Sequence, residues 1–297
     1  MRWEELTEEQ FDAAIYKSGG LCILPISSLE KNGQHLPVGA KGIIMESIIE
    51  EALKLEDVMV FSSATWLGEP ACFATNAPGE PTNFRGTIQI SQELQLTIFK
   101  ELCEEIVRNG FNKILVVYNQ NEWSFFVHHA IGCMAYEPVS YALMSKPAVN
   151  ASLSSADNVL KTILERRADF PMITDEDIKT LEKWAETGYG ENHATFADTA
   201  LLMAKYPELV AEDRYDADED VPSNKTDCVT SIWGVFASNA NSIHHPNGKK
   251  GFAPHGCTKS IGEAILKINA EHMADVFREL KKDKDCLRIA NGLSKIQ

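Results

Sequence analysis

Short, almost uninterrupted apolar runs alternate along this chain with segments of helical periodicity. The strand-like runs are residues 21–27 (LCILPIS), 57–63 (DVMVFSS), 113–119 (KILVVYN) and 140–145 (SYALMS). Strands that are apolar throughout are typical of a parallel sheet with both faces covered, because a sheet with one wet face alternates polar and apolar residues. The pattern therefore predicts an α/β fold with a mostly parallel sheet and helices on both faces.

Apolar residues at helical spacing predict helices at 43–55, at 92–107 and near the end of the chain, and a further helix between 119 and 140. In the segment 92–107 the apolar residues lie four apart, so we expect them to form its buried face, and Gly110 should end the helix. The residues that carry the three patterns are Ile44, Ile48 and Ile49; Leu94, Ile98, Leu102 and Ile106; and Ile261, Ile265, Ile268, Met273, Val276, Phe277 and Leu280.

The charge of the chain narrows its expected partners. Its formal net charge is −15, and phosphate backbones and anionic lipids repel such a protein, so we expect no nucleic acid and no membrane partner. The first 15 residues lack the basic and apolar regions of a signal peptide, and no apolar run is long enough to cross a bilayer. Seven cysteines without C-x-x-C spacing fit a reducing compartment, so a cytoplasmic location is expected.

The domain organisation predicted from the sequence is a single unit. With 297 residues and 44% hydrophobic content, the chain can bury one large core. The stretch from about 211 to 250 is rich in Asp, Asn, Pro and Ser and has no helical period. We therefore expect one domain over 1–297, with a long surface excursion at about 211–250 that serves as a lid or a subunit contact.

Four motifs in order resemble those of the creatininase (creatinine amidohydrolase) family. No single motif is specific, but four in the same order indicate a shared fold over most of the chain. The resemblance implies a creatininase-like α/β fold, a small-molecule substrate or ligand, and a closed homo-oligomer, which in this family is a hexamer. The motifs are PISSLEKNGQHLP (25–37), NFRGTIQIS (83–91), VVYNQNEW (116–123) and HATFADTALLMAKYPELV (193–210).

The resemblance also implies a dinuclear metal centre, but four of its five ligand places are altered here. In the family, two divalent ions lower the pKa of a bridging water and polarise the carbonyl of a small cyclic amide. Asn is a weak neutral ligand, Trp donates nothing to a metal, and Lys brings a positive charge, so only Glu30 would bind a cation well. We therefore expect no cofactor, and a single zinc or manganese ion at Glu30 is the option left open. The five places hold Glu30, Asn32, Lys41, Asn121 and Trp123.

Lys41 suggests how the site could work without that centre. Its ammonium stands where the family has an Asp between the cations, so it could balance Glu30 and Asp198 and polarise a substrate carbonyl. The alternative is that Lys41 has turned to solvent.

His35 and His193 keep the places of two family histidines, and either could exchange protons near neutral pH. Glu122 lies one residue away from an expected acidic ligand. Trp123 could fill the emptied cavity or stack on a flat substrate. The candidates for catalysis are therefore Glu30, His35, Lys41, Glu122, His193 and Asp198, and those for substrate binding are Asn32, Asn121, Trp123 and Tyr189.

Two functional hypotheses follow from these residues. The first is a divergent hydrolase of a small polar, cyclic substrate, either an activated amide or imide or a ring ketone of the oxidised-inositol type, working without the dinuclear centre. The alternative is a catalytically inactive family member that serves as a ligand-binding or partner subunit. The altered ligand places favour the alternative, whereas the retained Glu30, His35, His193 and Asp198 favour the hydrolase.

Overall fold

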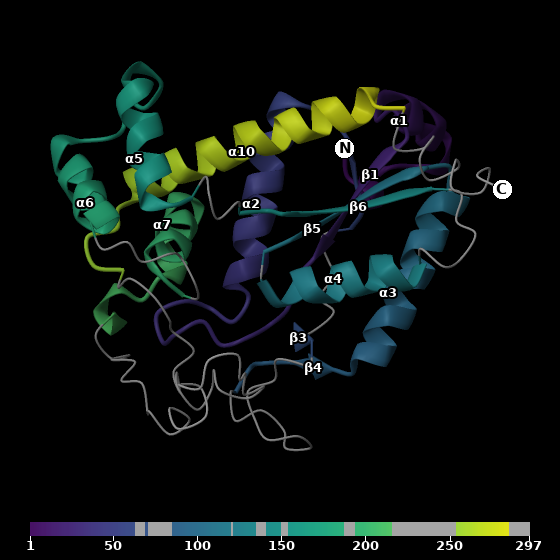
Figure 1. The fold of residues 1–297 in the computed structure, drawn as a ribbon, viewed down its shortest axis with the longest axis horizontal. Coiled ribbons are helices and arrows are strands. Elements are labelled where there is room, and N and C mark those ends of the chain that lie inside the picture. Colours follow the sequence, from purple (N-terminus) through teal and green to yellow (C-terminus); the bar gives the residue numbers. More distant parts are fainter. Residues whose placement is uncertain are drawn as a thin grey trace.

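The computed structural model has a four-stranded parallel sheet at its centre, in the order β2-β1-β5-β6 (Figure 1). The predicted α/β fold with a mostly parallel sheet is thereby confirmed. The strands are β1 (Leu21–Ile26), β2 (Met59–Val60), β5 (Lys113–Tyr118) and β6 (Ala142–Pro147), and a separate parallel pair is formed by β3 (Glu69–Pro70) and β4 (Gln89–Ile90). The structure describes residues 1–62, 69–70, 85–119, 121–134, 141–149, 154–186, 194–215 and 254–284.

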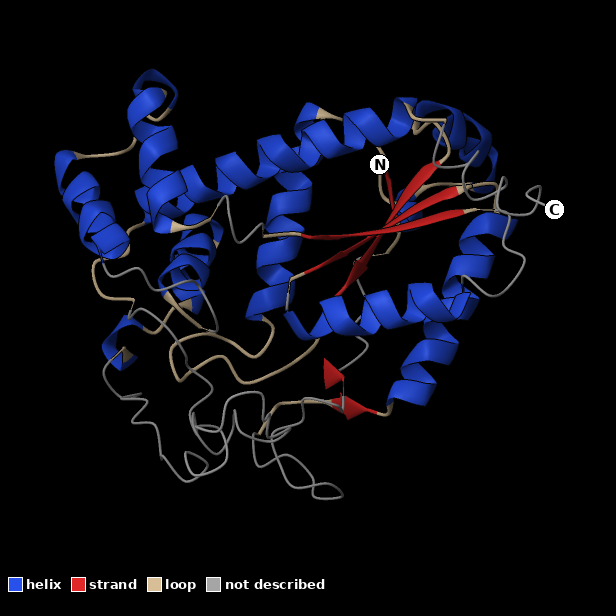
Figure 2. Ribbon diagram, in the orientation of Figure 1, coloured by secondary structure: helices blue, strands red, loops and turns tan. Residues whose placement is uncertain are grey.

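Helices cover both faces of the sheet, as predicted. Successive side chains of a strand point to opposite faces, and in this sheet each face lies in its own hydrophobic core. In β1, Leu21 and Ile23 belong to one core while Cys22 and Leu24 belong to the other. Figure 2 shows the strands enclosed between the two groups of helices. The first core takes side chains from α2 (Ala40–Leu55), α5 (Ala156–Glu165), α6 (Asp175–Glu186), α7 (Phe196–Lys205) and α10 (Lys259–Lys282), and the second from α1 (Phe11–Lys17), α3 (Gln92–Arg108) and α4 (Asn121–Met134).

The register of the two central strands brings the motifs that follow them to one edge. β1 and β5 pair residue for residue, from Leu21 opposite Lys113 to Ile26 opposite Tyr118. Their carboxyl ends are therefore level, and the segments after Ile26 and Tyr118 leave the sheet side by side. This edge is where ligands bind in open parallel sheets.

The buried face of α3 differs from the prediction. Leu94 is 52% exposed, and Ile98 and Leu102 are half-buried. The buried positions of the helix instead lie one residue further along the chain than predicted, at Gln95, Phe99 and Cys103. Phe99 there packs edge-on against Phe126 of α4, with the ring centroids 6.0 Å apart. Ile106 is buried as predicted, and the helix ends before Gly110, which adopts a positive φ. The buried residues of α3 are Gln95, Phe99, Cys103 and Ile106.

The boundaries of two strands also differ from the prediction. β2 has only two residues inside the predicted segment 57–63, and β6 lies two residues further along the chain than the predicted segment 140–145. Most of the predicted excursion, from residue 216 to residue 250, lies outside the described residues.

α10 has 24 residues, but neither it nor any other helix in the described part is apolar enough to cross a lipid bilayer. The Thr258 hydroxyl caps its first turn by accepting a hydrogen bond from the Ile261 amide at 3.2 Å. At the other end the buried Lys113 ammonium donates to two carbonyls of the last turn and to the carbonyl of the C-cap residue Asp283, groups that have no partner within a helix. These are Leu280 O at 2.6 Å, Lys281 O at 3.2 Å and Asp283 O at 3.2 Å.

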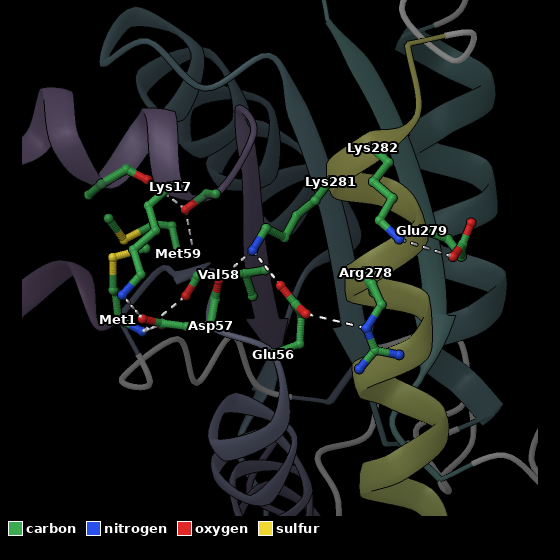
Figure 3. Close-up of polar contacts among 12 residues, drawn as sticks. Met1, Lys17, Glu56, Asp57, Val58, Met59, Arg278, Glu279, Lys281 and Lys282 are labelled. Atoms are coloured by element: carbon green, nitrogen blue, oxygen red, sulfur yellow. Dashed lines mark hydrogen bonds and ion pairs between the residues drawn. The ribbon is translucent and has the colours of Figure 1, made fainter.

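A second set of contacts ties the end of α10 to the end of α2 (Figure 3). Lys281 pairs with Glu56, and the neighbouring Asp57 carboxylate accepts hydrogen bonds from the Met1 ammonium at 2.6 Å and from Lys17 Nζ at 2.5 Å. Partial burial would raise the pKa of Asp57, but the hydrogen bonds and charges of Lys17 and the Met1 ammonium hold that pKa below its ordinary value.

α7 and α10 cross in backbone contact at Gly262. A Cβ atom at this position would lie only 1.8 Å from Ala200 O and 3.3 Å from Ala204 Cβ, so only glycine permits the approach. The crossing fixes the position of α7, whose first turn carries one of the candidate catalytic residues, Asp198.

Candidate functional site

The loop after β1 folds back on itself and buries two candidate residues. Glu30 N donates to Val38 O at 2.9 Å, and an isolated antiparallel bridge joins Asn32 to Leu36. Gly33 has φ +64° in the tight turn between them, a conformation that glycine adopts without strain. The Asn32 side-chain amide donates to Glu30 O at 3.0 Å. Glu30 and Asn32 are thus held by the loop itself, and both are buried.

Lys41, the second residue of α2, points inward rather than to solvent. Its Nζ donates to Asp198 Oδ2 at 2.7 Å, and the two side chains are only 8% and 11% exposed. The alternative in which Lys41 turns to solvent is therefore wrong. Asp198 is one of the two expected partners, and a contact between Lys41 and Glu30 stays a prediction.

Two helix N-termini act in opposite ways on this buried ion pair. The partial positive charge at the start of a helix disfavours an ammonium in the first turn of α2 and favours a carboxylate in the first turn of α7. Lys41 therefore depends strongly on Asp198, since removing two charges from water costs several kcal/mol per ion and close pairing offsets it. The arrangement holds a cation at the carboxyl edge of the sheet.

Asn119 joins the two motifs at this edge. It follows β5 directly, is buried, and its side-chain amide donates to Lys41 O at 3.1 Å. The contact fixes the start of α2 against the end of β5. Sequence reasoning did not name Asn119 as a site residue, although its place immediately after an apolar strand was a usable signal.

His35 is held from three directions. Its Nε2 lies 3.0 Å from Thr199 Oγ1, its carbonyl oxygen accepts from the Ala211 amide at 2.9 Å, and its ring meets Tyr215 edge-on with centroids 5.4 Å apart. Thr199 follows Asp198 directly, so consecutive residues of α7 contact His35 and Lys41. Sequence reasoning missed Thr199 and Tyr215, although Thr199 lies within the fourth motif.

Five predicted site residues are described only in part or not at all. Asn121, Glu122 and Trp123 form the first turn of α4, directly beyond the end of β5, but their side chains lie outside the described residues. Tyr189 and His193 lie wholly outside them. Their proposed roles in catalysis and substrate binding stay predictions.

The described side chains do not fit a pair of divalent ions at the place that the resemblance implies. A lysine ammonium has no lone pair to offer a metal, and this one takes up the Asp198 carboxylate. Asn32 Oδ1 is buried and accepts no hydrogen bond from the described residues, so it could face a metal ion. It is, however, a single uncharged oxygen ligand, which binds divalent ions weakly. In the described ranges no group of three or more His, Cys, Asp or Glu side chains is arranged to hold a metal.

Comparison with known proteins gives a consistent result. A family model described as creatinine amidohydrolase (creatininase) matches residues 4–277. A creatinine amidohydrolase of Pseudomonas putida is 20% identical over 278 residues, which are 93% of this chain and 95% of that protein. Among solved structures, a manganese creatininase has a TM-score of 0.65 at 16% identity, covering 95% of this chain and 99% of its own. A creatininase variant of Zn–Zn type has a TM-score of 0.66 at 16% identity, with 95% and 98% covered.

Proposed function

Because this chain belongs to the creatininase family, a family of hydrolases, we propose that it hydrolyses a small polar, cyclic substrate with a buried ion pair in place of a dinuclear metal centre. The substrate class is an activated amide or imide, or a ring ketone of the oxidised-inositol type. The observation that carries the proposal is the 2.7 Å contact between Lys41 Nζ and Asp198 Oδ2 at the carboxyl edge of the sheet.

In this proposal Lys41 supplies the charge that draws electrons from the substrate carbonyl. An ammonium already oriented by Asp198 and shielded from water stabilises the oxyanion that forms when water attacks the carbonyl carbon. His35 accepts the proton of that water. When the tetrahedral intermediate collapses and the carbon–nitrogen bond of an amide breaks, His35 returns the proton to the leaving nitrogen.

The remaining candidates are proposed to surround the same substrate. Glu30 is buried beside this edge, and Glu122 and His193 are proposed to reach it from the start of α4 and from the segment before α7. Asn32, Asn121, Trp123 and Tyr189 are proposed to contact the substrate ring.

The same reasoning limits the substrate. General acid–base catalysis contributes about 10²–10⁴-fold, whereas an unactivated amide also needs strong polarisation of its carbonyl and a potent nucleophile. Metal-bound water provides such a nucleophile at neutral pH when metals are present. We therefore expect creatinine to be a poor substrate of this chain and a strained imide or activated ketone to be a better one.

The test combines elemental analysis of the purified chain with assays on creatinine, succinimide and an oxidised inositol. We expect less than one equivalent of zinc or manganese, no gain in activity on adding zinc, and faster turnover of an activated compound than of creatinine. Lys41→Met, Glu30→Gln and His193→Ala should each abolish that turnover. Lys54→Met is the matched control, because Lys54 lies on the same helix with a 66% exposed side chain.

Two results would contradict the proposal. One is the binding of about two equivalents of zinc or manganese, lost on Glu30→Gln, together with zinc-dependent hydrolysis of creatinine. The other is turnover of the activated compound that Lys41→Met leaves unchanged, which would move the chemistry to another pocket.

We also propose that the chain forms a closed homo-oligomer, since most soluble oligomers have closed point-group symmetry. The hexamer that the family resemblance implies would have a mass of about 200 kDa, six times the 33.0 kDa of one chain. Light scattering at micromolar concentration should give this mass, and a mass of 33.0 kDa there would refute the proposal.

A further inference from the structure

We infer that Thr199 is a positioning residue that holds the ring proton of His35 on Nε2 and leaves Nδ1 as the nitrogen that accepts a proton. The position of the proton follows from the hydrogen bonds alone. Its catalytic meaning rests on the proposed function, in which His35 is the base.

The hydroxyl of Thr199 has one hydrogen and two neighbours to satisfy. Its Oγ1 lies 2.8 Å from Thr195 O and 3.0 Å from His35 Nε2. A carbonyl oxygen can only accept, so the hydroxyl hydrogen points to Thr195 O. Nε2 must then be the donor in the second contact, because Oγ1 has only lone pairs left for it.

The opposite assignment is unfavourable at this place. If Thr199 donated to Nε2, its oxygen and Thr195 O would face each other at 2.8 Å without a hydrogen between them. Thr195 and Thr199 are completely buried and His35 is 1% exposed, so bulk water does not relieve the repulsion. The ring is also held in place by the edge-on contact with Tyr215 and by the backbone bond to Ala211.

In this arrangement only Nδ1 of the neutral His35 ring can take up a proton. When the neutral ring takes up a proton, Nε2 keeps its hydrogen and its bond to Thr199, and the new proton goes to Nδ1. No change of tautomer is needed before the ring can accept a proton. Since Asp198 orients Lys41 and Thr199 orients His35, the first turn of α7 sets the cation and the base of the proposed reaction together.

The direct test is nitrogen NMR of the full chain labelled with ¹⁵N-histidine, with the His35 signals assigned by their loss in His35→Gln. We expect Nε2 to carry the hydrogen in the native chain and in Thr199→Ser, which keeps the hydroxyl. Thr199→Val removes the acceptor of the Nε2 hydrogen, so signals of the tautomer protonated on Nδ1 should appear.

Thr195→Val is the matched control for the spectrum. It makes the same change one helical turn earlier, its hydroxyl is buried and makes no hydrogen bond within the described part of the chain, and it keeps the Thr195 carbonyl. The spectrum of His35 should be unchanged. A native chain with the hydrogen on Nδ1, or a Thr199→Val spectrum equal to the native one, would overturn the inference.

Activity separates this inference from the proposed function. On whichever activated compound the chain turns over, Thr199→Val should lower kcat about 10- to 100-fold with little change in KM, part of what a general base contributes, and Thr199→Ser should restore it. If the spectra are as expected but nothing is hydrolysed, only the proposed function fails. If hydrolysis occurs and Thr199→Val leaves kcat unchanged, the positioning role fails while the hydrolase remains.

Discussion

Replacing Lys41 with alanine is expected to lower the free energy of unfolding by about 3–5 kcal/mol, the usual loss when one partner of a buried ion pair is removed. The effect should be large because Asp198 would lose its cation in a site where its side chain is only 11% exposed. The N-terminus of α7 would offset a small part of it, since helix termini contribute about 0.3–1 kcal/mol to a nearby charge. Urea unfolding of the native and variant chains measures the difference.

The control for this substitution lies on the same helix. Lys54→Ala removes a lysine that is 66% exposed and pairs with Glu51, so it should change the stability by less than about 1 kcal/mol. Replacing both partners, with Lys41→Met and Asp198→Leu together, should recover part of the loss because the Asp198 carboxylate is then no longer left without its cation. A loss below about 1 kcal/mol in Lys41→Ala would show that the pair is solvated.

Gly262→Ala is expected to destabilise the chain by about 3 kcal/mol or more, at or above the upper end of the usual overpacking range. Alanine is favoured over glycine in a helix by about 1 kcal/mol, but the new methyl group would lie 1.8 Å from the backbone oxygen of Ala200. A backbone atom cannot rotate away, so α7 and α10 must separate. Thermal and urea unfolding of the variant measure the loss.

The matched substitution is Gly132→Ala in α4, where an added Cβ meets nothing within 4 Å. It should leave the stability unchanged or raise it by up to about 1 kcal/mol. Because separation of the two helices also displaces Asp198 and Thr199, Gly262→Ala should reduce any hydrolytic activity at temperatures where the variant is still folded. If Gly262→Ala is as stable as Gly132→Ala, the close crossing of α7 and α10 is wrong.

The sheet could be predicted from the sequence because its evidence is local. The apolar runs at 21–27 and 113–119 show burial on both faces, and strands of that kind occur in parallel sheets. The face of α3 could not be predicted, since Leu94 and Phe99 fit the helical period almost equally well. The choice between them came from Phe126 on a neighbouring helix, and such tertiary contacts do not appear in a spacing pattern.

The site could be predicted as a set of residues but not as a set of contacts. The motifs named Lys41 and Asp198, and a lysine at the place of a family aspartate led us to expect a carboxylate partner, either Glu30 or Asp198. That the partner is Asp198, 157 residues away, depends on the placement of α7. Thr199 was within a recognised motif, but its role depends on the geometry of one hydroxyl between His35 and Thr195, for which the sequence has no signal.

The packing of α10 on α2 has a consequence for the nascent chain. α2 ends at Leu55 and α10 begins at Lys259, yet the two helices share one core. At a synthesis rate of about 5–20 residues per second, the ribosome needs roughly 10–40 s to bring the second helix to the first. During that time the apolar side of α2 is not covered by its final partner, and this interval is when we expect chaperones to bind the growing chain.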